Sequence, residues 1–219
     1  TASNNTAVGS SALDANTTGA SNNAFGQGAL GANTTANQNN AFGKLALGVT
    51  TTGADNSAFG QNALGSNTTA SNNTAVGSDA LQANTTGHSN VALGALALDA
   101  NTTAHANTSI GYGTLTVNTT GEYNVAVGAD ALGANTTASN NVAIGKNALV
   151  ANTTGASHVA IGRDALYTNV ANSFNIAIGH SALYTANDDS IDGTVAIGYD
   201  ACKVQVGNAA NAQFINATV

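Results

Sequence analysis

A short apolar segment that ends in glycine returns along the whole chain at a fixed interval. The tripeptide Ala-apolar-Gly, with Ser109 in place of Ala in one copy, ends at twelve glycines; the first eleven lie 17 residues apart and the last follows after 19. These repeat glycines are Gly9, Gly26, Gly43, Gly60, Gly77, Gly94, Gly111, Gly128, Gly145, Gly162, Gly179 and Gly198. Copies in one register predict a repeat architecture, in which like residues of successive units form columns.

Other positions are as regular as the glycine. The residue before each repeat glycine is always apolar, and Ala-Leu stands three and four residues after it, with Thr114 and Cys202 as exceptions. Asn stands four residues before the glycine in ten copies, and Asn-Thr-Thr begins seven residues after it in eight. We expect the two columns of large apolar residues to form the core, represented by Val8, Leu13, Phe25, Leu30, Phe42, Phe59, Ile144, Leu149, Ile161 and Leu166. We expect the glycines, among them Gly9, Gly26, Gly94, Gly145 and Gly162, to lie at turns or close backbone contacts.

The spacing does not suit a helix, because apolar residues do not recur three and four apart and Gly, Asn and Thr are frequent. Segments such as 142–145 are apolar and β-branched, which predicts a short strand buried on both faces. A second strand is expected through Ala-Leu and Asn-Thr-Thr, with asparagine amides hydrogen-bonding from coil to coil. The predicted fold is an all-β parallel β-solenoid of twelve 17-residue coils over residues 1–202, with a projecting insertion near 186–193. Residues 203–219 are expected to form an irregular C-terminal cap or the start of a following segment.

The core of such a coil is thin. One coil buries about two large side chains, at about 2–3 kcal/mol each, against a backbone ordering cost of about 1 kcal/mol or more per residue. A second apolar face covered by identical chains would supply the remainder, so we expect a homo-oligomer. Sequence parity does not assign which apolar column faces the partner.

The segments Asn141 to Gly145 and Ser157 to Gly162 resemble the N-S-V-A-I-G motif of the haemagglutinin-type head repeats of trimeric autotransporter adhesins. Similar units occur in phage tail-fibre and other trimeric fibre proteins. The resemblance covers about residues 3–202. It implies a left-handed parallel β-roll, a homotrimer, and a location outside the cell on a bacterial surface or a phage fibre.

Charge limits the partners. The chain carries a net charge of -7 with only four Lys and Arg residues, none adjacent, so a nucleic-acid surface is not expected. No apolar run is long enough to span a bilayer, and a single Cys excludes an internal disulfide.

Residues suited to catalysis do not cluster in the sequence. The histidines, His88, His105, His158 and His180, each lie in a different copy, and we interpret them as scattered substitutions. We therefore expect no enzyme activity, no cofactor and no metal site. The Asp column at Asp79, Asp130, Asp164 and Asp200 has one carboxylate per coil, and the acidic patch at Asp188, Asp189 and Asp192 does not have the spacing of an EF-hand. We interpret that patch as a solvated loop.

Aromatic residues offer one candidate surface. Tyr167, Tyr184 and Tyr199 lie toward the C-terminal end and are candidates for binding a carbohydrate, although stacked aromatics in a solenoid more often serve packing. Cys202 stands in the leucine column, which predicts a buried, unreactive thiol.

Together these features predict a structural and adhesive segment of an extracellular trimeric fibre, with itself and a host receptor or glycan as partners. An ice-binding or other surface-array solenoid is the alternative, because threonines recur in every coil. Ice binding usually needs two outward threonines per coil with one residue between them, whereas adjacent threonines should point to opposite faces.

Overall fold

The computed structural model describes residues 2–186, 192–205 and 213–215, and these fold as an all-β parallel β-solenoid with about one turn per 17 residues. The chain forms two compact units, Thr1–Asn107 and Thr108–Val219. The described residues contain strands and turns and no helix.

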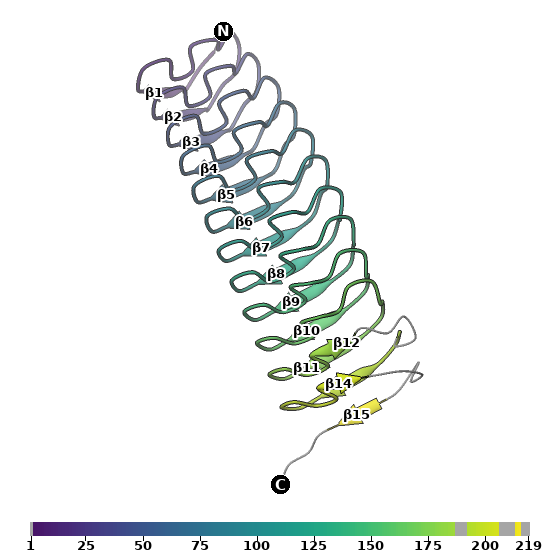
Figure 1. The fold of residues 1–219 in the computed structure, drawn as a ribbon. Coiled ribbons are helices and arrows are strands. Elements are labelled where there is room, and N and C mark those ends of the chain that lie inside the picture. Colours follow the sequence, from purple (N-terminus) through teal and green to yellow (C-terminus); the bar gives the residue numbers. More distant parts are fainter. Residues whose placement is uncertain (1, 187–191, 206–212, 216–219) are drawn as a thin grey trace. The chain divides into compact units, whose positions relative to one another are not determined.

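Within each unit, a coil contributes one three-residue strand that pairs in parallel with the strand of the next coil (Figure 1). In the first unit, six strands pair in chain order: β1 Thr6–Val8, β2 Asn23–Phe25, β3 Asn40–Phe42, β4 Ser57–Phe59, β5 Thr74–Val76 and β6 Val91–Leu93. In the second unit, seven do so: β7 Thr108–Ile110, β8 Val125–Val127, β9 Val142–Ile144, β10 Val159–Ile161, β11 Ile176–Ile178, β13 Val195–Ile197 and β15 Gln213–Ile215.

The two large apolar columns face opposite ways. In β9 the central Ala143 is fully buried, whereas Val142 is half-buried and Ile144 is 38% exposed. This follows from the period of two along a strand, which turns Ala inward and both neighbours outward. The leucine column fills the coil instead, as at Leu149 and Leu166, which are fully buried.

In the single chain only the leucine column is therefore buried, and burial of the other column by partner chains stays a prediction. We call the residues one and three before each repeat glycine the outer face. Of the expected core residues, Leu30, Leu149 and Leu166 are buried, Leu13, Phe25 and Phe42 are partly exposed, and Val8, Phe59, Ile144 and Ile161 are exposed.

The second expected strand is replaced by turns in nearly every coil. The column leucines adopt positive φ, 50° at Leu30 and 53° at Leu149, and a left-handed residue cannot continue an extended ladder. In the Asn-Thr-Thr segment, the N–H groups of Thr17 and Thr18 both donate to the Thr34 carbonyl, which is not a strand pattern. A second strand position appears only in β12 Thr185–Ala186, paired with β14 Val204–Gln205, among the residues that the structure describes.

Buried asparagines supply the polar contacts between coils. Asn39, four residues before Gly43, donates through Nδ2 to the Gly53 carbonyl (2.8 Å), and its Oδ1 accepts the backbone N–H of Asn56 (2.9 Å). A second column links amide to amide, with Asn101 Nδ2 donating to Asn84 Oδ1 (2.8 Å). Both of these asparagines are fully buried, and most polar side-chain atoms of the two columns have a hydrogen-bond partner.

This second column is interrupted where another residue replaces asparagine. Thr50 turns its hydroxyl to the Asn67 carbonyl (3.0 Å), so Asn33 Oδ1 receives no hydrogen bond. Asn169 Oδ1 is likewise buried without a hydrogen-bond partner, because the corresponding residue of the next coil is Ala186.

The repeat glycines lie where the backbones of successive coils come closest. Gly145 has φ of 135°, in a region that favours glycine, and a Cβ built there would lie 2.5 Å from the Gly162 carbonyl oxygen. Gly9, Gly26 and Gly162 have equivalent contacts, and Gly94 has φ of 138°.

After the step of 19 residues, β13 begins at Val195 and continues the sheet beside β11. Most of the expected projection at 186–193, with Asp188 and Asp189, lies outside the described residues. Asp192 is exposed, and its Oδ1 accepts the Ser173 N–H (2.7 Å).

The close approach of glycine backbones leads to a stability prediction. Gly145→Val should lower the free energy of unfolding by about 3 kcal/mol or more, since it combines backbone strain with a carbonyl clash. Gly133→Val is the matched control, because its φ is ordinary and Val150 occupies the same column one coil later. Denaturant unfolding of both variants measures the difference, and equal stabilities would contradict the role of the glycine column.

Candidate ligand-binding surface

The three candidate tyrosines occupy two different columns. Tyr167 and Tyr184 lie five residues after their repeat glycines, and their rings stack with centroids 4.8 Å apart and planes 1° from parallel. Tyr199 lies one residue after Gly198, is 67% exposed, and stacks on His180 at 5.3 Å. The structure thus brings Tyr167 and Tyr184 together and places Tyr199 in another column.

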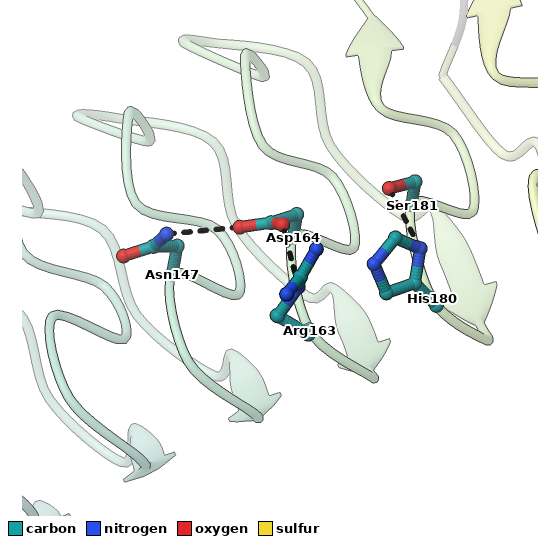
Figure 2. Close-up of polar contacts among 5 residues, drawn as sticks. All are labelled: Asn147, Arg163, Asp164, His180 and Ser181. Carbon is teal, nitrogen blue, oxygen red and sulfur yellow. Dashed lines mark hydrogen bonds and ion pairs between the residues drawn. The ribbon is translucent and has the colours of Figure 1, made fainter.

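A polar edge follows the repeat glycines of the second unit (Figure 2). Asn147 Nδ2 donates to Asp164 Oδ1 (2.9 Å), and Arg163 Nε contacts Asp164 Oδ2 (3.1 Å). The residues two after each glycine have positive φ, such as 58° at Asp164, which turns their side chains onto this edge. In the first unit, Asn62 Nδ2 donates in the same way to Asp79 Oδ1 (3.0 Å).

A serine and a histidine meet on the same edge. Ser181 Oγ lies 3.0 Å from His180 Nδ1, as Figure 2 shows. Ser181 is only 4% exposed, and the stacking partner of the His180 ring is Tyr199. A nucleophile must reach its substrate and needs an oriented base, so this geometry fits an edge contact better than a catalytic pair.

His158 replaces asparagine in a buried column and takes over its role. The ring is fully buried, its Nδ1 accepts the Asn175 N–H (3.2 Å), and the His158 N–H donates to Asn141 Oδ1 (3.0 Å). An Nδ1 that accepts a backbone N–H carries no proton, so the neutral ring has its proton on Nε2. Burial lowers the pKa of His158 to about 4, against smaller raising contributions from the Asn172 and Asn175 backbone and from Asp192.

The interpretation of the histidines as scattered is wrong for one pair. His88 and His105 both stand six residues before a repeat glycine, and their rings stack with centroids 4.6 Å apart. The common column is visible in the sequence. Among the described residues, no group of three or more His, Cys, Asp or Glu side chains is arranged to hold a metal ion.

The C-terminal exception in the leucine column is less buried than expected. Cys202 is only partly buried, and desolvation raises the pKa of its thiol. In the Asp column, Asp79 and Asp164 each accept from the asparagine of the preceding coil, whereas Asp200 contacts Lys203 Nζ at 3.2 Å.

An open groove of about 500 Å³ runs along the surface of the second unit beside the polar edge. Asp130 and Asn147 line one side, Val117 and Val150 contribute apolar surface, and Gly133 adds no side chain between them. The carboxylate of Asp130 lies over Gly113, where a Cβ would be 2.8 Å from its Oδ1. The sequence analysis did not predict this groove. The signal was present in Gly113 and Gly133, which stand in columns that hold larger residues in other coils.

In the part of the chain that the structure describes, no helix is long and apolar enough to cross a membrane. Comparisons with protein-family models, curated proteins and solved structures find no match to this chain.

The buried His158 predicts a pH dependence of stability. The folded-state pKa of about 4 lies below the ordinary 6.5, so between these values the unfolded chain binds a proton that the folded chain excludes. The free energy of unfolding should therefore fall as the pH drops from about 6.5 to about 4, by about 3 kcal/mol from this residue.

His158→Asn, which restores the residue of the other copies, should remove this part of the acid sensitivity. Denaturant unfolding at pH 7.5 and 4.5 compares the two proteins, and the acidic residues common to both cancel in the difference. Equal losses of stability on acidification would refute the assignment to His158.

Proposed function

We propose that this chain is a structural and adhesive segment of an extracellular trimeric fibre on a bacterial surface or a phage. The observation that carries the proposal is the outer face, which places apolar side chains on the outside of strands β1 to β11 and β13 of a thin solenoid. A single chain leaves this surface in water, and identical chains packed around an axis would cover it.

The outer face is most apolar in the second unit. Strands β8 to β11 and β13 each turn two apolar side chains outward, such as Val159 and Ile161 on either side of the buried Ala160. Ile144, Ile161 and Ile197 are 38%, 36% and 37% exposed. Rows of β-branched side chains at a constant spacing form a flat surface suited to a second sheet.

The outer face of the first unit combines polar and aromatic ladders. Phe25, Phe42 and Phe59 stack with centroids 4.7 and 4.8 Å apart, and Asn23 Nδ2 donates to Asn40 Oδ1 (2.9 Å). In the trimer that we propose, the aliphatic rows of the second unit form the larger apolar contact. The left-handed course of a β-roll is part of the same proposal.

A fibre segment also needs resistance to proteolysis. Only four Lys and Arg residues are present, and successive strands within each unit are held together by backbone hydrogen bonds and by buried asparagines. The residues of the surface columns can therefore change without any change in the core, so that they can adapt to a receptor or glycan.

The threonine columns bear on the ice-binding alternative. The first threonine of a pair donates its hydroxyl to the next coil, as Thr85 Oγ1 does to the Thr102 carbonyl (3.0 Å), while Thr86 is exposed. Ordering ice on a flat solenoid face favours two outward columns, and here one of the two hydroxyls is already bonded. We therefore expect no thermal hysteresis, and its observation at micromolar protein would favour the alternative.

The assembly is tested by changing the outer face. Ile144→Asp should dissociate the particle, because three carboxylates would be buried in an apolar contact. Thr154→Asp, on an exposed turn of the following segment, is the matched control and should leave the mass unchanged. Native mass spectrometry and sedimentation velocity read the result, and a wild-type monomer would overturn the trimer.

Adhesion is tested separately with beads coated with the full chain and applied to cells at increasing flow. We expect coated beads to remain attached where beads coated with an unrelated protein detach. Equal detachment from bacterial and animal cell panels would overturn the adhesive function.

A further inference from the structure

We propose that the groove beside the polar edge of the second unit binds a neutral oligosaccharide. This inference deepens the proposed adhesive function and rests on it. It specifies the chemical class of the ligand, a chain of uncharged sugars, and the place on this chain where that ligand binds.

The groove offers hydrogen-bond acceptors that neighbouring residues leave unused. Asp130 lines it, and its carboxylate has no hydrogen-bond or ion-pair partner among the described residues. Asn147 donates to Asp164, while its oxygen points away from that contact toward the preceding coil (Figure 2). Sugar hydroxyls are closely spaced hydrogen-bond donors, so they can donate to adjacent acceptors on successive coils.

The other side of the groove is apolar. Val117 is 41% exposed, and Val150 lies one coil after Gly133 in the same column. A pyranose ring carries C–H groups on its faces and hydroxyls around its edge, so it can contact the valines and the acceptors together.

An aromatic ring follows the groove residues in this column. Tyr167 follows Val150 by one coil; one face of its ring is covered by Tyr184, and its column neighbour on the other side is the smaller Val150. Aromatic rings contact the apolar faces of sugars, which makes Tyr167 a natural boundary for a bound saccharide.

Charge selects the class of sugar. Asp130 is the one charged residue in the lining of the groove. The nearby cations Lys146 and Arg163 each stand one residue after a repeat glycine, outside that lining, and Arg163 pairs with Asp164. A sialylated or sulfated glycan would bring its anion to an unpaired carboxylate, which disfavours binding. A neutral oligosaccharide has no such cost.

The first test is an array of neutral and acidic oligosaccharides probed with the full chain, followed by calorimetry with the best neutral ligand. Gly133→Val places an isopropyl group in the middle of the groove and should weaken binding by about tenfold or more. Gly65→Val makes the same change at the same column in the first unit, outside the groove, and should leave the affinity unchanged. Melting curves of both variants establish that each is folded.

A second variant tests the role of charge. Asp130→Asn keeps an acceptor and places the residue that Asn62 and Asn147 already provide in this column. It should retain neutral binding within about threefold and admit acidic glycans that the wild type rejects.

The outcomes separate this inference from the proposed function. Binding of acidic glycans alone, no binding to any glycan, or neutral binding that survives Gly133→Val would each overturn the groove assignment. Coated beads that still adhere in those cases would leave the adhesive function intact. Neutral binding by a non-adhering monomer would support the groove and overturn the fibre.

Discussion

The hydrogen bond between a buried asparagine and the coil above or below it is the interaction on which the rest of the structure depends. A coil of 17 residues with Ala and Leu inside has little apolar volume, and its turns leave many backbone groups without strand partners. The side chains of Asn39 and its equivalents both donate to and accept from the following coil at full burial, where an unsatisfied group would cost about 1–3 kcal/mol. Small inward side chains then suffice, because the coils are held by polar contacts as much as by packing.

The tight turns need unusual backbone geometry at fixed places. Each coil combines a glycine that admits a neighbouring carbonyl with non-glycine residues at positive φ, such as Leu149 and Asp164. Left-handed residues cost about 1 kcal/mol or more each, and the cost recurs in every coil. The stacking of identical coils must compensate for it, which explains why the columns vary so little inside the coil and so freely outside.

Much of this could be predicted from the sequence, because spacing alone defines the columns. The solenoid, the buried leucines and the close contacts at the glycines follow from the period. The period does not show which apolar column faces outward, because the alternation in a three-residue strand flanked by turns is too short to tell its inner from its outer face. The left-handed leucines, which replace the expected second strand by turns, were equally hidden, because leucine carries no sequence signal for positive φ.

Residues that depart from the repeat make contacts that the sequence predicts only in part. Ser109 and Thr114 both replace Ala in the same coil, and the structure brings the two buried hydroxyls into contact. His158 stands where asparagine is usual and keeps the same backbone contacts. The groove depends on the absence of side chains at Gly113 and Gly133, which becomes visible only when neighbouring columns are placed side by side in space.

The linked amides of the second asparagine column have a direction. From Asn135 to Asn169, every Nδ2 donates toward the preceding coil and every Oδ1 that has a partner accepts from the following one. Amide dipoles aligned in this way polarise one another, so each bond strengthens its neighbours. The column therefore acts as a cooperative chain with a positive and a negative end, and a residue such as Thr50 divides one long dipole into two shorter ones.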